Sequence, residues 1–116
     1  MAGVLEPVTF TKIVGEEIKD LVIPKEFIRD FEHLDKHLMI YTRVTGPDAW
    51  KVSKFFEDQE GKIFSIDTTE SQVGVISDDY ILTSAYLDEG PHLSADIDIE
   101  PPMVRAILDF EKKSSK

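Results

Sequence analysis

The chain contains no cysteine among its 116 residues. This absence excludes a disulfide scaffold, thiolate catalysis and any zinc or iron–sulfur site that uses cysteine ligands. Basic residues are also few, 13 against 23 acidic residues, which gives a formal net charge of −10. Nucleic acid is held mainly by Lys and Arg on phosphate groups, so this balance argues against a generic polyanion binder.

Long apolar runs and glycine-rich loops are missing as well. The longest apolar runs are far too short to cross a bilayer, and residues 1–7 lack the basic start and apolar stretch of a signal peptide. No Gly-rich phosphate loop and no Gly-x-Ser-x-Gly nucleophile elbow occurs. We therefore expect a non-enzymatic, intracellular protein without a cofactor and without a membrane segment.

The size and apolar content predict one folded domain. A length of 116 residues fits a single domain, and a hydrophobic content of 41% is too high for a chain disordered by composition. We expect a tail over residues 1–7, a β-rich domain over 8–100, and a short helix with a basic tail over 101–116.

β-Branched residues, aromatic residues and apolar–polar alternation predict that most of the domain is β-strand. Short strands of this kind favour a mainly β fold with short helices, which we expect to be a small open β-barrel or a strongly bent sheet. The expected strands cover residues 8–14, 18–23, 38–44, 50–56, 62–67, 73–76, 80–87 and 93–99, with a turn over 77–79.

Two segments have apolar residues at helical spacing instead. Pro24 suits the first position of a helix, and a helix over residues 24–34 is therefore expected. A second short helix is expected from Met103, because apolar residues recur at positions 107, 108 and 110. The apolar residues that follow Pro24 are Phe27, Ile28, Phe31 and Leu34.

Two histidines have a spacing that would suit a metal. His33 and His37 are four residues apart, so on one continuous helix they would face the same side. No third ligand lies at a recognisable distance, since His92 is far along the chain. Solvated surface histidines are therefore favoured, and no metal site is expected.

Carboxylates are concentrated in the second half of the chain. Residues 1–58 hold 8 basic and 11 acidic residues, whereas residues 59–116 hold 5 and 12. Asp96, Asp98 and Glu100 alternate with apolar residues, which predicts an acidic face on one strand. This row lacks the looped backbone that wraps calcium, so it favours a solvated face or a surface for a basic protein.

Three motifs follow one another in the first half of the chain. The first is Phe-x-Lys within residues 10–13, and the second, within 21–27, is Ile-Pro with a phenylalanine three residues after the proline. The third is Trp-x-Val at residues 50–52, where alternation predicts that Trp50 is a core anchor. In this order and spacing they resemble the plant B-three DNA-binding domain superfamily, most closely its reproductive-meristem branch.

The resemblance covers residues 8–56 and implies a DNA-binding pseudobarrel. It implies a nuclear transcription-factor domain that reads the major groove of double-stranded DNA with two arms, which correspond here to residues 12–20 and 51–62. The second half lacks the Gly-Trp-x-x-Phe segment of that family. The basic residues of the arms, and thus the implied DNA contacts, are Lys12, Lys19, Lys51, Lys54 and Lys62.

The same arms also contain acidic residues that would repel a duplex, among them Glu16, Glu17, Glu57 and Asp58. The alternative interpretation is an acidic interaction protein, of an inhibitor or immunity type, that binds a basic partner. Charge complementarity would accelerate that association. Convergence of the lysines on one concave face would favour DNA, whereas carboxylates on every face would favour the basic partner.

Overall fold

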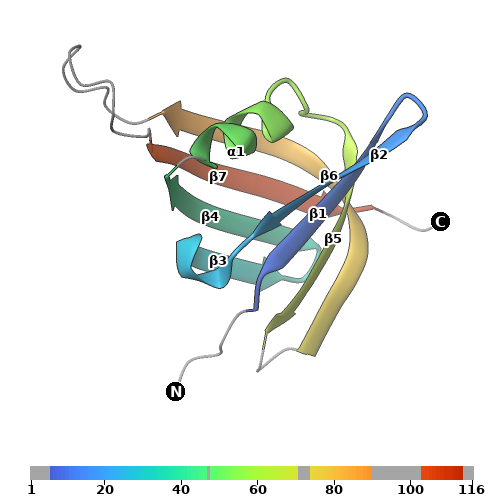
Figure 1. Ribbon diagram of the computed structural model, residues 1–116. Coiled ribbons are helices and arrows are strands. Elements are labelled where there is room, and N and C mark those ends of the chain that lie inside the picture. The colour runs from blue at the N-terminus through green and yellow to red at the C-terminus, as the bar shows by residue number, and fades with distance from the viewer. Residues whose placement is uncertain (1–5, 47, 71–73, 90–102, 114–116) are drawn as a thin grey trace, which may run out of the picture.

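The computed structural model describes residues 6–46, 48–70, 74–89 and 103–113. In these residues seven strands form one antiparallel sheet in the order β2-β1-β5-β6-β7-β4-β3 (Figure 1). A short 3-10 helix, η1 (Lys25–Phe27), precedes β3, and the helix α1 (Ala49–Phe56) joins β4 to β5. The strands are β1 (Val8–Val14), β2 (Glu17–Ile23), β3 (Ile28–Leu34), β4 (His37–Thr45), β5 (Ile63–Glu70), β6 (Gly74–Glu89) and β7 (Met103–Lys112).

The sheet curls into a half-barrel, and α1 packs on its concave face (Figure 1). This arrangement confirms the expected mainly β fold with a small open barrel. Strands β5, β6 and β7, from the second half of the chain, lie between β1 and β4 of the first half. The two halves therefore form one sheet, although their net charges differ.

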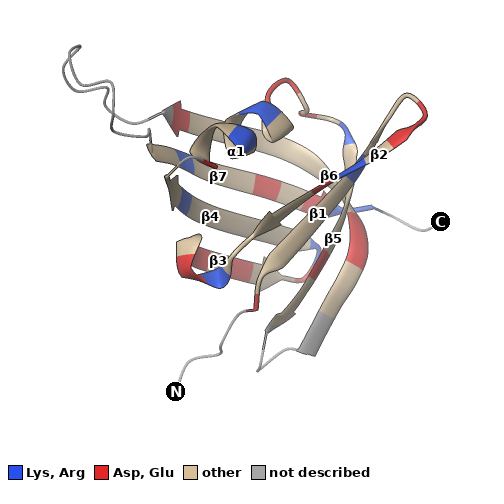
Figure 2. Ribbon diagram, in the orientation of Figure 1, with Lys and Arg blue, Asp and Glu red and all other residues tan. Residues whose placement is uncertain are grey.

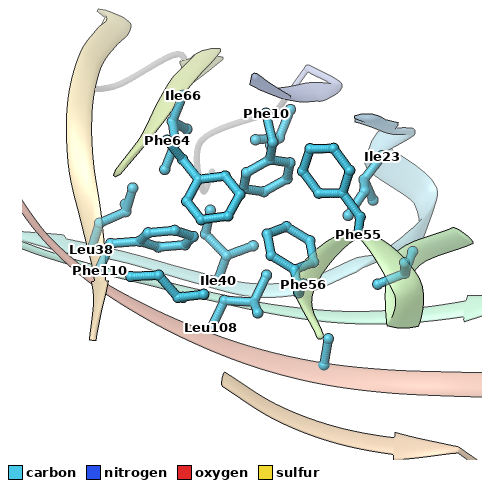
Figure 3. Packing of buried hydrophobic residues seen from close by; sticks show 14 of the residues in the cluster. Phe10, Ile23, Leu38, Ile40, Phe55, Phe56, Phe64, Ile66, Leu108 and Phe110 are labelled. Carbon is cyan, nitrogen blue, oxygen red and sulfur yellow. The ribbon is translucent and has the colours of Figure 1, made fainter. Parts of the chain in front are cut away.

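The core is built from strand residues that alternate toward the concave face and from the inner side of α1. Phenylalanine rings from four elements meet there (Figure 3). The ring centres of Phe10 and Phe56 are 5.1 Å apart, those of Phe56 and Phe64 are 5.5 Å apart, and those of Phe64 and Phe110 are 6.0 Å apart. Edge-to-face and tilted pairs at these distances stabilise a core beyond the effect of buried area alone.

Residues 50–56, expected to be a strand, belong to α1, so that prediction is wrong. Ala49, Val52, Ser53 and Phe56 recur at helical spacing and are all buried against the sheet. Trp50 is not the expected core anchor, because the helix turns it outward and leaves 40% of it exposed. The apparent alternation of Trp50 with Val52 therefore came from two positions on different sides of a helix.

The helix expected over residues 24–34 is also wrong beyond its first turn. Pro24, with φ of −61°, immediately precedes η1, but β3 starts at Ile28. A bulge between Ile28 and Asp30 inserts one residue into β3. The inward-facing Ile28 and Phe31 are consequently three residues apart, a spacing that imitates a helix.

β6 is one strand of 16 residues and runs through positions 77–79, where a turn was expected. The polar side chains at these positions interact with side chains of the neighbouring strands instead of with the backbone of a turn. Ser65 Oγ of β5 donates a hydrogen bond to Asp79 at 2.8 Å, and Lys112 Nζ of β7 lies 3.5 Å from the carboxylate of Asp78. The prediction of two separate strands is therefore wrong.

The segment from Met103, expected to be a helix, is the strand β7, which lies inside the sheet between β6 and β4. Its inward-facing residues are Val104, Ala106, Leu108 and Phe110, all fully buried. The period of two in this segment outweighs the helical spacing of its other apolar residues. The strand expected over 93–99 lies outside the described residues.

The contrast between Phe56 and Trp50 gives a test of the position of α1. Phe56→Ala removes a fully buried ring from the centre of the core, and we expect it to lower the free energy of unfolding by about 3–5 kcal/mol. Trp50→Ala is the matched control on the same helix, with an expected loss of about 1 kcal/mol or less. Urea unfolding followed by circular dichroism measures both, and a larger loss for Trp50→Ala would contradict this packing.

Candidate interaction surface

Lys12, the first of the five candidate DNA-contacting lysines, is directed into the fold. It follows Val8 and Phe10 on the concave side of β1, and only 8% of it is exposed. Its Nζ donates a hydrogen bond to the Phe55 carbonyl at 2.6 Å and lies 4.3 Å from the centre of the Phe55 ring. Lys12 thus connects β1 to the carboxyl end of α1.

The environment of Lys12 disfavours its charged form. Burial lowers the pKa of its amine below 10.5, and the positive charge of Lys19 lowers it further. Lys19 is the directly opposed residue on β2, so the two side chains share the concave side of the sheet. The structure therefore brings these two candidates together, with Lys12 engaged inside the protein.

Two of the other candidate lysines lie beside carboxylates. Lys19 Nζ is 3.2 Å from the Glu17 carboxylate, and Lys51 Nζ is 3.2 Å from that of Asp48. Lys54 is exposed in the last turn of α1. Figure 2 shows basic residues on α1 close to acidic residues in the loop that follows it. This end of the molecule therefore carries charges of both signs rather than a continuous basic face.

Lys62 lies at a hollow of about 670 Å³ between the β1–β2 hairpin and the start of β5. Lys12 and Asp79 line the same hollow. Its apolar part contains Ile13 and Ile18, a directly opposed pair that is 71% and 70% exposed. This surface is mainly apolar around one exposed lysine, so it has little capacity to hold a phosphate backbone.

The two histidines at metal-compatible spacing are separated by the sheet. His33 pairs with the buried Leu38 and faces inward, with its Nε2 3.4 Å from the hydroxyl of Tyr80. His37 lies on the neighbouring strand, 3.4 Å from the Asp109 carboxylate. Among the residues that the structure describes, no group of three or more His, Cys, Asp or Glu is arranged to hold a metal ion.

A second hollow, of about 550 Å³, lies between the loop after α1 and the last part of β6. Three apolar residues and three carboxylate residues line it, and we call it the acidic groove. The residues that line it are Phe56, Glu57, Asp58, Glu60, Ala85 and Leu87. The position of the carboxylates follows from the fold, because residues 57–61 connect α1 to β5.

Backbone geometry fixes this loop against the sheet. Asp58 and Gly61 have φ values of 58° and 90°, in the left-handed region that glycine adopts without strain. Glu60 Oε2 accepts a hydrogen bond from the Ala85 N–H at 3.1 Å. The sequence predicts the acidic residues of 57–60 only as charges that repel DNA. The one local indication of a separate surface is that these carboxylates are concentrated just before Gly61.

Two further expectations concern the rest of the surface. Asp96, Asp98 and Glu100, the expected acidic strand face, lie outside the described residues. None of the helices in the described part of the chain has the length and apolar character needed to span a membrane.

Comparison with known proteins gives no relative for this chain. A scan of protein-family models, a search of curated proteins and a search of solved structures each returned no match.

The surroundings of Lys12 predict a measurable pH effect. Because its pKa in the folded protein is lower than in the unfolded chain, the contribution of Lys12 to the free energy of unfolding rises as the pH increases from that lowered value to 10.5. NMR titration of the Lys12 ε-methylene group should give a lower midpoint in the native protein than in urea. Lys19→Gln should raise the native midpoint, since it removes one of the two causes. Equal midpoints in both states would contradict the burial of the amine.

Proposed function

We propose that this protein is a non-enzymatic binding protein that recognises a basic partner protein through the acidic groove. The observation that carries the proposal is that Glu57, Asp58 and Glu60 line one hollow together with apolar residues of α1 and β6. Apolar residues bordered by polar and charged groups are common in protein–protein contact surfaces. These carboxylates select a partner with Lys or Arg at matching positions.

The overall charge supports the same partner class. With a formal net charge of −10, the protein attracts basic proteins over a distance of about 10 Å at 0.1 M salt. Such attraction raises association rates and suppresses association with acidic surfaces. Two of the lysines that oppose this charge, Lys19 and Lys51, are already close to carboxylates of their own.

Binding of duplex DNA by a nuclear transcription-factor domain is the second candidate function. The observation in its favour is the exposed Lys54 beside Lys51 on α1, together with the resemblance of residues 8–56 to the B-three superfamily. Lys12 contributes less to this candidate than its sequence position implies, because its amine is bonded to the Phe55 carbonyl. Few phosphate contacts would remain, so such binding would be weak and strongly dependent on salt.

The test is an NMR titration of the isotope-labelled protein with a heptalysine peptide. We expect amide shifts at Glu57, Asp58 and Glu60, and an affinity that falls as salt rises. In the triple variant Glu57→Gln, Asp58→Asn, Glu60→Gln the affinity should fall by about ten-fold, since each exposed charge contributes a fraction of a kcal/mol. Asn tolerates the left-handed backbone of position 58.

The control is a variant that loses three carboxylates elsewhere, Glu16→Gln, Glu17→Gln, Asp20→Asn in the β1–β2 hairpin. It changes the net charge equally and should lose much less affinity for heptalysine. Equal losses in the two variants would contradict a localised site. A parallel titration with random duplex at about 50 mM salt tests the second candidate, and strong shifts at Lys51 and Lys54 there would favour DNA instead.

A further inference from the structure

The last part of β6 has a neighbouring strand on one side only. β5 pairs with β6 no further than Ile81, and the final backbone bonds join Leu82 to Gly61 and Lys62. β7 continues to pair with β6 as far as Glu89. No strand in the described part of the chain pairs with the other side of β6 beyond Leu82. We call residues 85–87 on this side the free edge.

The direction of the backbone groups along the free edge follows from one hydrogen bond. The Ala85 N–H donates to Glu60 Oε2, so it points away from β7 and into the acidic groove. Backbone groups alternate along an antiparallel strand. The N–H and C=O of Leu87 therefore face the groove as well, whereas those of Tyr86 face Ile107 of β7.

The free edge differs from the two outer strands of the sheet in its charge. β2 contains Glu17, Lys19 and Asp20, and β3 contains Arg29, Asp30 and Glu32. Charged residues of this kind protect the edge of a sheet from pairing with other chains. Residues 82–87 of β6 contain no charged residue at all. Asp88, the next residue of β6, is paired with Arg105 of β7. The carboxylates across the groove repel an acidic strand and attract a basic one.

We infer that the free edge of β6 binds an extended segment of the basic partner as an additional β-strand. This inference rests on the proposed function and specifies its mode of recognition. The C=O groups of Ala85 and Leu87 would accept hydrogen bonds from the added strand, and the Leu87 N–H would donate one to it. Strand addition of this type takes its affinity from the backbone and its specificity from alternate side chains.

The position of the side chains predicts which residues of the added strand face inward. Ala85 and Leu87 pack against the core cluster, so their side chains lie on the concave side. In an antiparallel pair, directly opposed residues place their side chains on the same face. The residues of the added strand that form backbone hydrogen bonds with Leu87 should therefore be apolar, and their side chains should lie over Phe56. The residues between them should be Lys or Arg, whose long side chains reach the carboxylates of the groove.

The probe is a heptapeptide in which Lys and Val alternate, with Lys at both ends, compared with two N-methylated forms. N-methylation of the valines removes the N–H groups that would face β6. We expect it to lower the affinity by about ten-fold, because the hydrogen bonds to the carbonyls of Ala85 and Leu87 are lost together. N-methylation of the internal lysines removes N–H groups that face away from β6, and this matched control should bind nearly as well as the parent peptide.

Hydrogen exchange gives a second measurement on the protein itself. Addition of the parent peptide should slow exchange of the Leu87 amide, which faces the groove. The Tyr86 amide, which is already bonded to β7, should change little. Slower exchange at Leu87 without a matching change at Tyr86 supports strand addition.

The result that overturns this inference is an equal effect of the two methylations, or no effect of either, with unchanged exchange at Leu87. Binding of heptalysine that depends on Glu57, Asp58 and Glu60 would then leave the proposed function standing without strand addition. Absence of any binding by heptalysine and by the alternating peptide would overturn both. Failure of strand addition and failure of the proposed function would therefore give different results.

Discussion

The packing of α1 against the concave face of the sheet is the interaction on which the other features depend. Phe56 provides it, with its ring centre 5.1 Å from that of Phe10 on β1 and 5.5 Å from that of Phe64 on β5. Phe110 on β7 closes the same cluster at 6.0 Å from Phe64. A one-layer sheet of seven strands would leave an apolar face in water, and this helix covers it. The cluster joins elements from both halves of the chain, so neither half has a complete core alone.

The position of α1 also determines where a binding surface can form. Lys12 bonds to the Phe55 carbonyl and fixes the carboxyl end of the helix beside β1. From that point the chain must cross to β5, and the left-handed conformations at Asp58 and Gly61 make the crossing short. β5 therefore begins only at Ile63, opposite Ile81. The remainder of β6 has no partner from β5, and the crossing loop leaves its carboxylates above that unpaired side.

The sequence predicted the fold class and the strands whose alternation is uninterrupted, such as residues 8–14 and 38–44. It failed where a local irregularity changed the spacing, as at the bulge after Ile28, and where a helix face looked like alternation, as at Trp50. The surroundings of the candidate residues were predictable only in part. Lys12 continues the inward period of Val8 and Phe10, so its burial was readable. The contact of residues 57–60 with β6 includes a hydrogen bond between Glu60 and Ala85, which are 25 positions apart, and it depends on how β5 pairs with β6. Such long-range register is not contained in any local pattern.

In the proposed binding mode, the acidity of the chain and the free edge act together. An unprotected edge of uncharged residues would normally pair with another copy of the same chain. Here any second copy brings a net charge of −10 toward a groove that already holds three carboxylates. Glu60 further occupies the Ala85 N–H, so an incoming strand must compete with a carboxylate for that position. A basic strand can pair with the displaced carboxylate, whereas an acidic strand cannot. In this proposal, the charges that oppose pairing with a second copy are the same ones that select a basic partner.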